Sequence, residues 1–236
     1  MLRTRRMSSR MTVIRTLMTI ITVLIVVCVI FLPMVVSLAT KNYSVAENIS
    51  DEDIIEKINS ASSIYLHRNR PSLSESYDVV VDGVKICEIN GQFIKMFWNE
   101  NLEMTSINNN IIYSMEENFG FLRSNWSVFD ASGNKLCSLE EKMSLKNDYN
   151  IYIGENVIGT LRADWFSIFG SSSIYNSNNE TIYMADRDIA GSTTIRRVKE
   201  SDISNICALM MIIGENCMND KSNSNSSSSS DGSSSK

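Results

Sequence analysis

The 236-residue chain contains one histidine, His67, so any Ser-His-Asp or Cys-His catalytic arrangement would have to use it. It lies in the basic run His67-Arg68-Asn69-Arg70, and no GxSxG nucleophile motif occurs in the sequence. The charged neighbours favour a solvent-exposed imidazole over a catalytic base. The sequence therefore gives no support for a hydrolase.

Three pairs of carboxylates have the residue types that general acid–base chemistry uses. They are Asp51 with Asp53, Glu116 with Glu117, and Glu140 with Glu141. A general acid needs a raised pKa, which burial provides, but each pair lies in a polar stretch and we expect it to be solvated. The sequence has no His- or Cys-rich metal cluster, Walker A loop or dinucleotide fingerprint. We therefore predict a protein that is not an enzyme and has no cofactor.

Two short basic groups are the local feature that suggests a binding site. Arg68 and Arg70 follow the histidine, whereas Arg196, Arg197 and Lys199 precede the last apolar segment. If the fold brings its first and last strands together, these residues can meet and bind an anion or a lipid headgroup. The alternative is that they are scattered solubilising charges.

Residues 16–39 form an apolar run of 24 residues without a charge, roughly the length that a ~30 Å hydrocarbon core requires. All the basic residues ahead of it are arginines: Arg3, Arg5, Arg6, Arg10 and Arg15. Arginines on one side of a span stay in the cytoplasm, so we expect a transmembrane signal-anchor with residues 1–15 inside and the rest lumenal or extracellular. The alternative is a signal peptide cleaved after Ser37-Leu38-Ala39, which would give a secreted protein. The run exceeds the usual h-region of about 7–15 residues.

The charges follow the same division. Without the five N-terminal arginines, the chain's 22 basic residues fall to 17, against 27 acidic residues. So acidic a domain repels phosphate, and we expect no nucleic-acid partner. Membrane contact is expected through the N-terminal helix, with an anionic lipid or a protein as the further partner.

Asn-x-Ser/Thr sequons follow the apolar run and fit an exported chain. They begin at Asn42, Asn48, Asn125, Asn179 and Asn225. A chain this rich in Asn, Ser and Thr also gives such matches by chance, so they permit glycosylation without establishing it.

Four cysteines lie beyond the apolar run, which itself holds Cys28. They are Cys87, Cys137, Cys207 and Cys217. An even number in an oxidising compartment permits two disulfides, with three pairings open. Buried free thiols are the alternative, because cysteine packs as a small apolar residue.

Polar segments flank the predicted domain. Residues 40–61 are expected to form a polar stalk, within which Asp51–Ile58 has the acidic first turn of a short helix. Residues 219–236 are almost entirely Ser, Asn and Gly and are expected to be disordered. The folded domain is therefore expected over residues 62–218.

Turn-forming residues recur at short intervals in this domain, and β-branched and aromatic residues alternate between them. The predicted strands are 77–81, 84–89, 94–98, 102–107, 111–116, 126–129, 135–140, 150–153, 157–161, 173–175, 181–184 and 193–198. Many short strands at regular spacing predict a mainly β fold, either a sandwich or a barrel.

The segment Ile206–Ile213 is an exception, because it is apolar on every side. Ser201 is a candidate N-cap and Gly214 a candidate C′ residue, which predicts a helix of about 13 residues. A helix apolar all round must be buried, yet this one is too short to cross a membrane. We therefore expect strands to enclose it. Its buried residues are predicted to be Cys207, Leu209, Met210, Ile212 and Ile213.

This pattern resembles the LURP-one-related, tubby C-terminal-like family, in which a closed, twelve-stranded β-barrel surrounds one C-terminal hydrophobic helix. The segments that carry the resemblance are YDVVVDGVKICEINGQF (77–93), WSVFDASGNKLCSLEEKMSLKNDYNIYIGENVIGTL (126–161) and SDISNICALMMIIG (201–214). Asp130–Gly133 matches the family's D-x-x-G turn between strands, and Asp202 matches the acid that leads its closing helix. Two features depart from the family: the export segment, and Ile213-Gly214 where an Ile-Asp pair is common.

The resemblance implies lipid-associated or protein-binding roles. Tubby relatives bind phosphoinositide headgroups and scramblase relatives associate with bilayers, but none of their basic motifs matches this chain residue by residue. The expected function is a membrane-tethered, exported, non-enzymatic domain that binds lipid headgroups or a protein. The alternative is a phospholipid scramblase-like protein. The apolar run counts against this alternative, because it offers no polar track for headgroups.

Overall fold

The computed structural model describes residues 15, 17–27, 43–69, 75–91, 101–119, 124–142, 148–164 and 170–227. The chain divides into two units, Met1–Lys41 and Asn42–Lys236. In the first unit residues 17–27 are helical, while residue 16 and residues 28–39 of the expected span lie outside the described part. Among the described residues, no helix combines the length and the apolar character that crossing a membrane would take.

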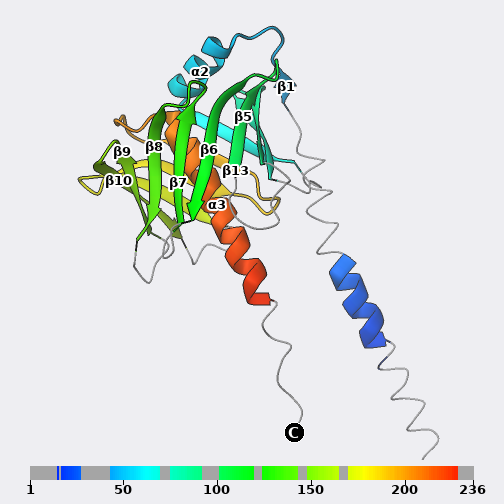
Figure 1. Cartoon of the computed structure of the whole chain (residues 1–236). Helices are drawn as coiled ribbons and strands as arrows, with labels where there is room; N and C mark the ends of the chain where they lie inside the picture. The colour runs from blue at the N-terminus through cyan, green and yellow to red at the C-terminus, as the bar shows by residue number, and fades with distance from the viewer. Residues whose placement is uncertain are drawn as a thin grey trace, which may run out of the picture. The chain divides into compact units, whose positions relative to one another are not determined.

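The second unit is a closed antiparallel β-barrel of twelve strands, β2 to β13, which confirms the predicted mainly β class and the barrel (Figure 1). Neighbouring strands pair in sequence, β13 pairs with β2, and the β4–β5 pairing completes the circle. The strands are β1 (Ser44–Val45), β2 (Ser63–Arg68), β3 (Ser76–Val81), β4 (Val84–Gly91), β5 (Asn101–Ser106), β6 (Ile111–Phe119), β7 (Ser124–Asp130), β8 (Lys135–Glu141), β9 (Asp148–Ile153), β10 (Asn156–Asp164), β11 (Ser171–Asn176), β12 (Thr181–Arg187) and β13 (Thr193–Arg197). The short β1 lies outside the circle and pairs in parallel with β4.

One barrel strand was missed. β2 was not predicted, because its alternation of Ile64 and Leu66 is short and ends in the basic run around Arg68. The predicted strand 94–98 lies outside the described residues. Tight turns lie where the sequence indicated them: Asp82 and Gly83 both have positive φ values, 52° and 75°, as a two-residue hairpin turn with right-handed twist requires.

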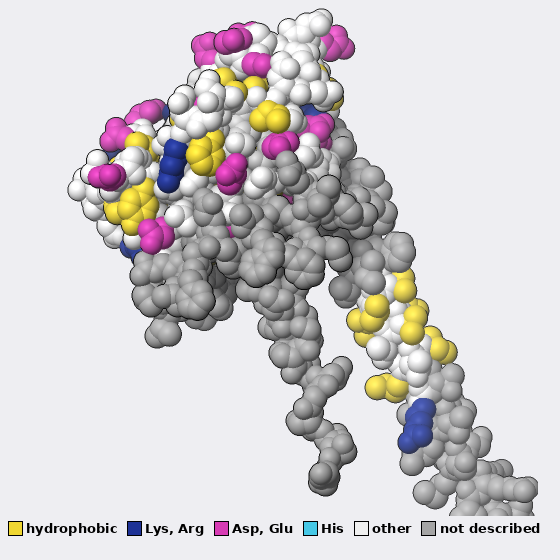
Figure 2. Space-filling model, in the orientation of Figure 1, with side chains coloured by type: hydrophobic (Ala, Val, Ile, Leu, Met, Phe, Trp, Pro, Cys, Tyr) yellow, Lys and Arg dark blue, Asp and Glu magenta, His cyan; other side chains and the backbone are white. Residues whose placement is uncertain are grey.

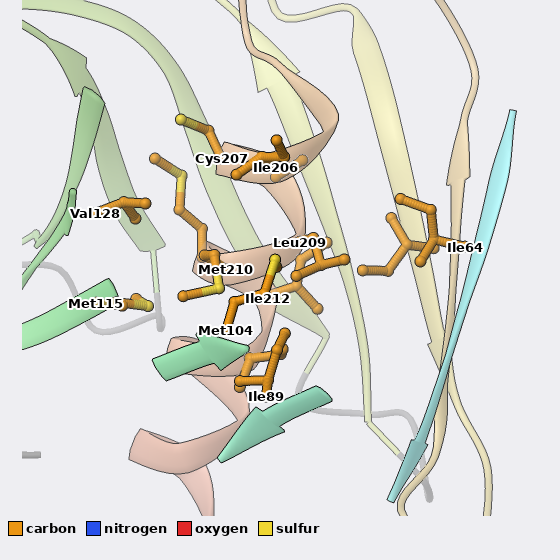
Figure 3. Packing of buried hydrophobic residues seen from close by; sticks show 14 of the residues in the cluster. Ile64, Ile89, Met104, Met115, Val128, Ile206, Cys207, Leu209, Met210 and Ile212 are labelled. Carbon is orange, nitrogen blue, oxygen red and sulfur yellow. The ribbon is translucent and has the colours of Figure 1, made fainter. Parts of the chain in front are cut away.

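The C-terminal helix α3 (Asn205–Ser227) runs through the barrel, as predicted. Residues 206–213 are at most 3% exposed. Leu209, Met210 and Ile212 face side chains of the surrounding strands, among them Ile89 and Met104 (Figure 3). Burying so much apolar surface from both partners supplies the main favourable term in folding.

The predicted bounds of α3 were wrong at both ends. The N-cap is Ser204, whose hydroxyl accepts the Cys207 N–H at 3.2 Å, while Ser201 accepts the Ile203 N–H in the turn before it. Gly214 does not end the helix. A Cβ there would lie 2.4 Å from Met115 Cε, so glycine serves the close approach of α3 to the wall.

The helix also continues to Ser227, through the first part of the segment predicted to be disordered. Residues 228–236 of that segment lie outside the described part of the chain.

Residues 43–61 form part of the domain, not the free stalk expected from their polarity. The predicted short helix is present as α2 (Asp51–Ser60), with Ser50 as its N-cap and Ile54 and Ile58 fully buried. The first residue of α3, Asn205, donates from Nδ2 to the carbonyls of Ile58 and Ala61 at 2.6 and 2.8 Å. α2 is thereby fixed to the end of the barrel at which α3 begins.

Candidate functional site

The interior of the barrel is occupied by α3, so its apolar centre is a packed core and not a ligand cavity. Leu209, Met211 and Ile213 on the helix and Met104 and Val128 on the wall are all fully buried. Barrels of this size hold either side chains or a small ligand, and here the helix takes that space. The described surfaces that are open to solvent therefore lie on the outside of the barrel and at its ends.

The basic residues predicted to form one patch are not brought together. β2 and β13 do pair, but they are antiparallel, and Arg196 lies opposite Ser63 at the start of β2. Arg68 is the last residue of β2, so it lies at the other end of the strand pair from Arg196 and the two cations that follow. Arg70 lies outside the described residues. The pairing was predicted correctly, whereas the register separates the two groups.

Each described member of this basic set also has an acidic partner. Arg68 pairs with Glu75 at 2.5 Å, Arg196 with Asp186, Arg197 with Glu200 at 3.4 Å, and Lys199 with Glu180 at 2.7 Å. The Lys199 hydrogen bond lowers the pKa of the Glu180 carboxyl. The Arg196–Asp186 and Lys199–Glu180 pairs are exposed and add little stability, but all four pairs offset positive charge that an anionic headgroup would otherwise meet.

A buried polar network on the outer side of β2, β3 and β4 was not predicted. The Asp78 carboxylate is 1% exposed and accepts hydrogen bonds from Tyr43 Oη, from Asn69 Nδ2 at 2.9 Å and from Lys85 Nζ at 2.9 Å. Burial alone raises the pKa of Asp78, but these hydrogen bonds and the Lys85 charge stabilise the carboxylate and bring its pKa to about 2. Burial, and then the bond to Asp78, raises the pKa of the Tyr43 hydroxyl.

His67 belongs to this network and is 1% exposed, so the prediction of a solvated imidazole was wrong. Its ring lies 5.6 Å from that of Tyr43 and 6.1 Å from that of Tyr65, and it pairs across the strands with Asp78. Tyr43 stands 24 positions before His67 in the sequence. The charged residues next to His67 therefore could not show that a distant tyrosine packs over its ring.

A hollow of about 550 Å³ lies between the segment before α2, α2 itself and the start of β4. Its lining combines apolar residues with three carboxylates and a single cation: Ala46, Glu47, Asn48, Ile49, Asp53, Glu56, Lys57, Ser60 and Val84. Acidic side chains also gather over α2 on the face shown in Figure 2. The volume is in the range of small-molecule pockets, and the lining is predominantly negative.

The candidate carboxylate pairs have mixed environments. Asp53 and Glu116 are exposed, as expected, but Glu117 is 2% exposed, so that part of the prediction was wrong. Glu117 lies opposite Trp126 on the β6–β7 pair. Within the part of the chain that the structure describes, no group of three or more His, Cys, Asp and Glu side chains is placed to hold a metal ion.

The four cysteines beyond the apolar run form one disulfide. Cys137 of β8 is bonded to Cys207 in the first turn of α3, while Cys87 and Cys217 are buried thiols outside this disulfide. The sequence left disulfides and buried thiols open as alternatives, and each alternative holds for one pair of cysteines.

The sequons differ in accessibility. Asn48 and Asn179 are exposed in turns, with φ values of 55° and 61°. Asn125 is partly buried in β7, with its Oδ1 enclosed and without a hydrogen bond. Asn42 lies outside the described residues, and Asn225 lies in a stretch of α3 whose side chains are not described.

These features define a class: a closed β-barrel whose core is its own C-terminal helix. The sequence model of the LURP-one-related family matches residues 62–223, and the chain belongs to that family. The barrel and its helix fall within the matched range, whereas β1 and α2 precede it.

Similarity to individual proteins is low. A protein from Arabidopsis thaliana solved by X-ray crystallography is 10% identical, with a TM-score of 0.47, over 72% of this chain and 98% of the plant chain. No curated protein matches the chain.

Proposed function

We propose that this chain is an exported, membrane-anchored, non-enzymatic binding domain that recognises a protein partner on the outside of its barrel. The observation that carries the proposal is the complete occupation of the barrel by α3, in which residues 208–211 are fully buried. With the interior filled, binding specificity has to come from the wall, the hairpins and the hollow beside α2.

Export is supported by the Cys137–Cys207 disulfide, which joins two buried positions in the core. Disulfides form and persist in oxidising compartments and are rare in the cytosol. The arginine-rich N-terminus ahead of an apolar run supports the same topology, with the barrel on the far side of the membrane.

A protein partner is favoured over an anionic lipid headgroup because of the charges. The described basic residues that could bind phosphate are separated along the β2–β13 pair and matched by acids. Beyond the apolar run the acids outnumber the basic residues by 27 to 17, which repels an anionic surface. A scramblase-like activity is less favoured, since residues 206–213, the apolar part of α3, are enclosed by strands and at most 3% exposed.

Topology can be tested by labelling intact cells with a membrane-impermeant maleimide. In a Cys28→Ser background the remaining cysteines are buried or disulfide-bonded, so an introduced cysteine is the accessible thiol. Ser132→Cys, at an exposed hairpin, should be labelled without permeabilisation, and Ser8→Cys only after it. The reverse result would place the barrel in the cytoplasm and overturn the proposal.

Headgroup binding can be tested separately by titrating inositol trisphosphate into the full chain in neutral detergent. We expect no saturable binding tighter than about 1 mM, and no change when Arg196 and Arg197 are both replaced by alanine. Binding below about 100 µM that this double substitution removes would favour a lipid headgroup over a protein partner.

A further inference from the structure

The barrel wall has an edge that its own twelve strands do not use. β4 pairs with β5 only from Cys87 to Gly91, so the backbone around Val84 and Lys85 extends past the end of β5. β1 fills this edge in parallel: the Ser44 N–H donates to the Gly83 carbonyl at 3.1 Å and the Ala46 N–H to the Lys85 carbonyl at 2.9 Å. The edge is thus a site for strand addition, which elsewhere serves in peptide recognition.

Beside this edge the Tyr43 side chain contacts Asp78 and His67. Tyr43 Oη donates to the buried Asp78 carboxylate, and its ring packs against His67. Asn69 and Lys85 fix the same carboxylate from other directions. A phenylalanine here would fill the space but would take one hydrogen bond from a buried charge, which costs more than an ordinary hydrogen bond.

The resident strand is held less firmly than the helix that follows it. Ile54 and Ile58 of α2 are fully buried, whereas residues 43–48 are all partly or fully exposed. The connection from β1 to α2 is short, and Asn48 within it has a left-handed φ of 55°. Short connections with such residues favour the exchange of an element between copies, because the extended form relieves the turn.

We propose that the β4 edge and the buried Asp78 carboxylate form a docking site for an extended strand bearing a tyrosine, and that a second copy of this chain can supply it. In the exchanged form Tyr43–Ala46 of one copy would leave its own β4 and occupy the same site on its neighbour. A second copy is the expected occupant, because Tyr43–Ala46 already makes these contacts with Asp78 and β4 within one chain.

The test uses disulfide trapping in the full chain in detergent, again with Cys28→Ser. Ser44 and Val84 are paired across β1 and β4, so cysteines at these positions can join while Lys85 stays in place. Mixed chains that carry Ser44→Cys or Val84→Cys alone should give a covalent dimer on oxidation. The dimer yield should rise several-fold when the Val84→Cys chain also carries Tyr43→Ala, which weakens its own resident strand.

Specificity comes from matched controls. Adding Asp78→Asn to that acceptor chain should return the dimer yield to its lower value, since the phenol then loses its charged acceptor. Ser44→Cys mixed with Ser132→Cys, an exposed position on another hairpin, measures random collision. A single chain that carries both Ser44→Cys and Val84→Cys should close an internal disulfide, which shows that the two positions can join. The proposal is overturned if that internal disulfide closes in full but the dimer does not exceed the collision control or does not respond to Asp78→Asn.

Discussion

The part of α3 whose burial is described, residues 205–217, is held in different ways at its two ends. At its start, α3 is tied to the wall by the Cys137–Cys207 disulfide and to α2 by the Asn205 side chain. Further along, Gly214 allows close contact with Met115 and Trp126, and Glu215 is a buried acid, 3% exposed. The comparison shows that an apolar helix inside a barrel gains its position from a few specific contacts at its ends, while its middle supplies the burial.

The largest loss of stability is expected from a substitution in the middle of this part of α3. Leu209→Asp places an uncompensated charge at a fully buried position, and we expect the domain not to fold. The measurement is the thermal unfolding of purified protein, with Val157→Asp at an exposed hairpin position as control. A cooperative transition near that of wild type would contradict enclosure of the helix.

At the start of the helix, loss of the disulfide should cost about 4 kcal/mol, because it closes a long loop in the unfolded chain. Urea unfolding should show this loss in the Cys137→Ala, Cys207→Ala double variant and in reduced wild type. The double variant itself should not respond to reductant. Unchanged stability of wild type under reduction would mean that packing alone positions this end.

At the other end, Gly214→Val should lower the free energy of unfolding by about 2–3 kcal/mol, because branched carbons would displace Met115 and press on Trp126. Met115→Ala in the same chain should restore part of the loss by making room. If the losses of stability from Gly214→Val and Met115→Ala simply add, Gly214 is not needed for this close approach.

The smallest effect is expected from Asn205→Ala, at about 1–2 kcal/mol. It removes two hydrogen bonds to carbonyls at the end of α2 but leaves Tyr183 Oη its second acceptor, the Ile203 carbonyl at 2.7 Å. Hydrogen exchange should increase in α2 more than in β6 and β7. A uniform increase would mean that Asn205 stabilises the whole barrel and not this junction.

The architecture could be predicted because its signals are local. Asp82-Gly83 specifies a hairpin from two adjacent residues, and the apolar run of α3 shows on its own that it must be enclosed. The candidate site depended on contacts between distant segments. Tyr43 covers His67, and the register of β2 against β13 separates Arg68 from Arg196, neither of which a local pattern specifies.

The boundaries of α3 were harder to predict from the sequence than its burial. Ser201 and Ser204 are both serines ahead of the apolar run, and only the backbone path decides which hydroxyl meets a helical N–H. Gly214 has the residue type that ends helices, yet its role is set by the side chain of Met115 on a strand almost a hundred positions earlier. Residue type alone cannot separate these uses of glycine.

The pairing of Thr193 with Leu66 has a consequence for how this protein is made. The seam that closes the wall joins the earliest barrel strand to the latest, and the segment it must enclose leaves the ribosome after both. The domain therefore cannot complete its fold until both β13 and α3 have left the ribosome, and contacts between such distant segments form slowly.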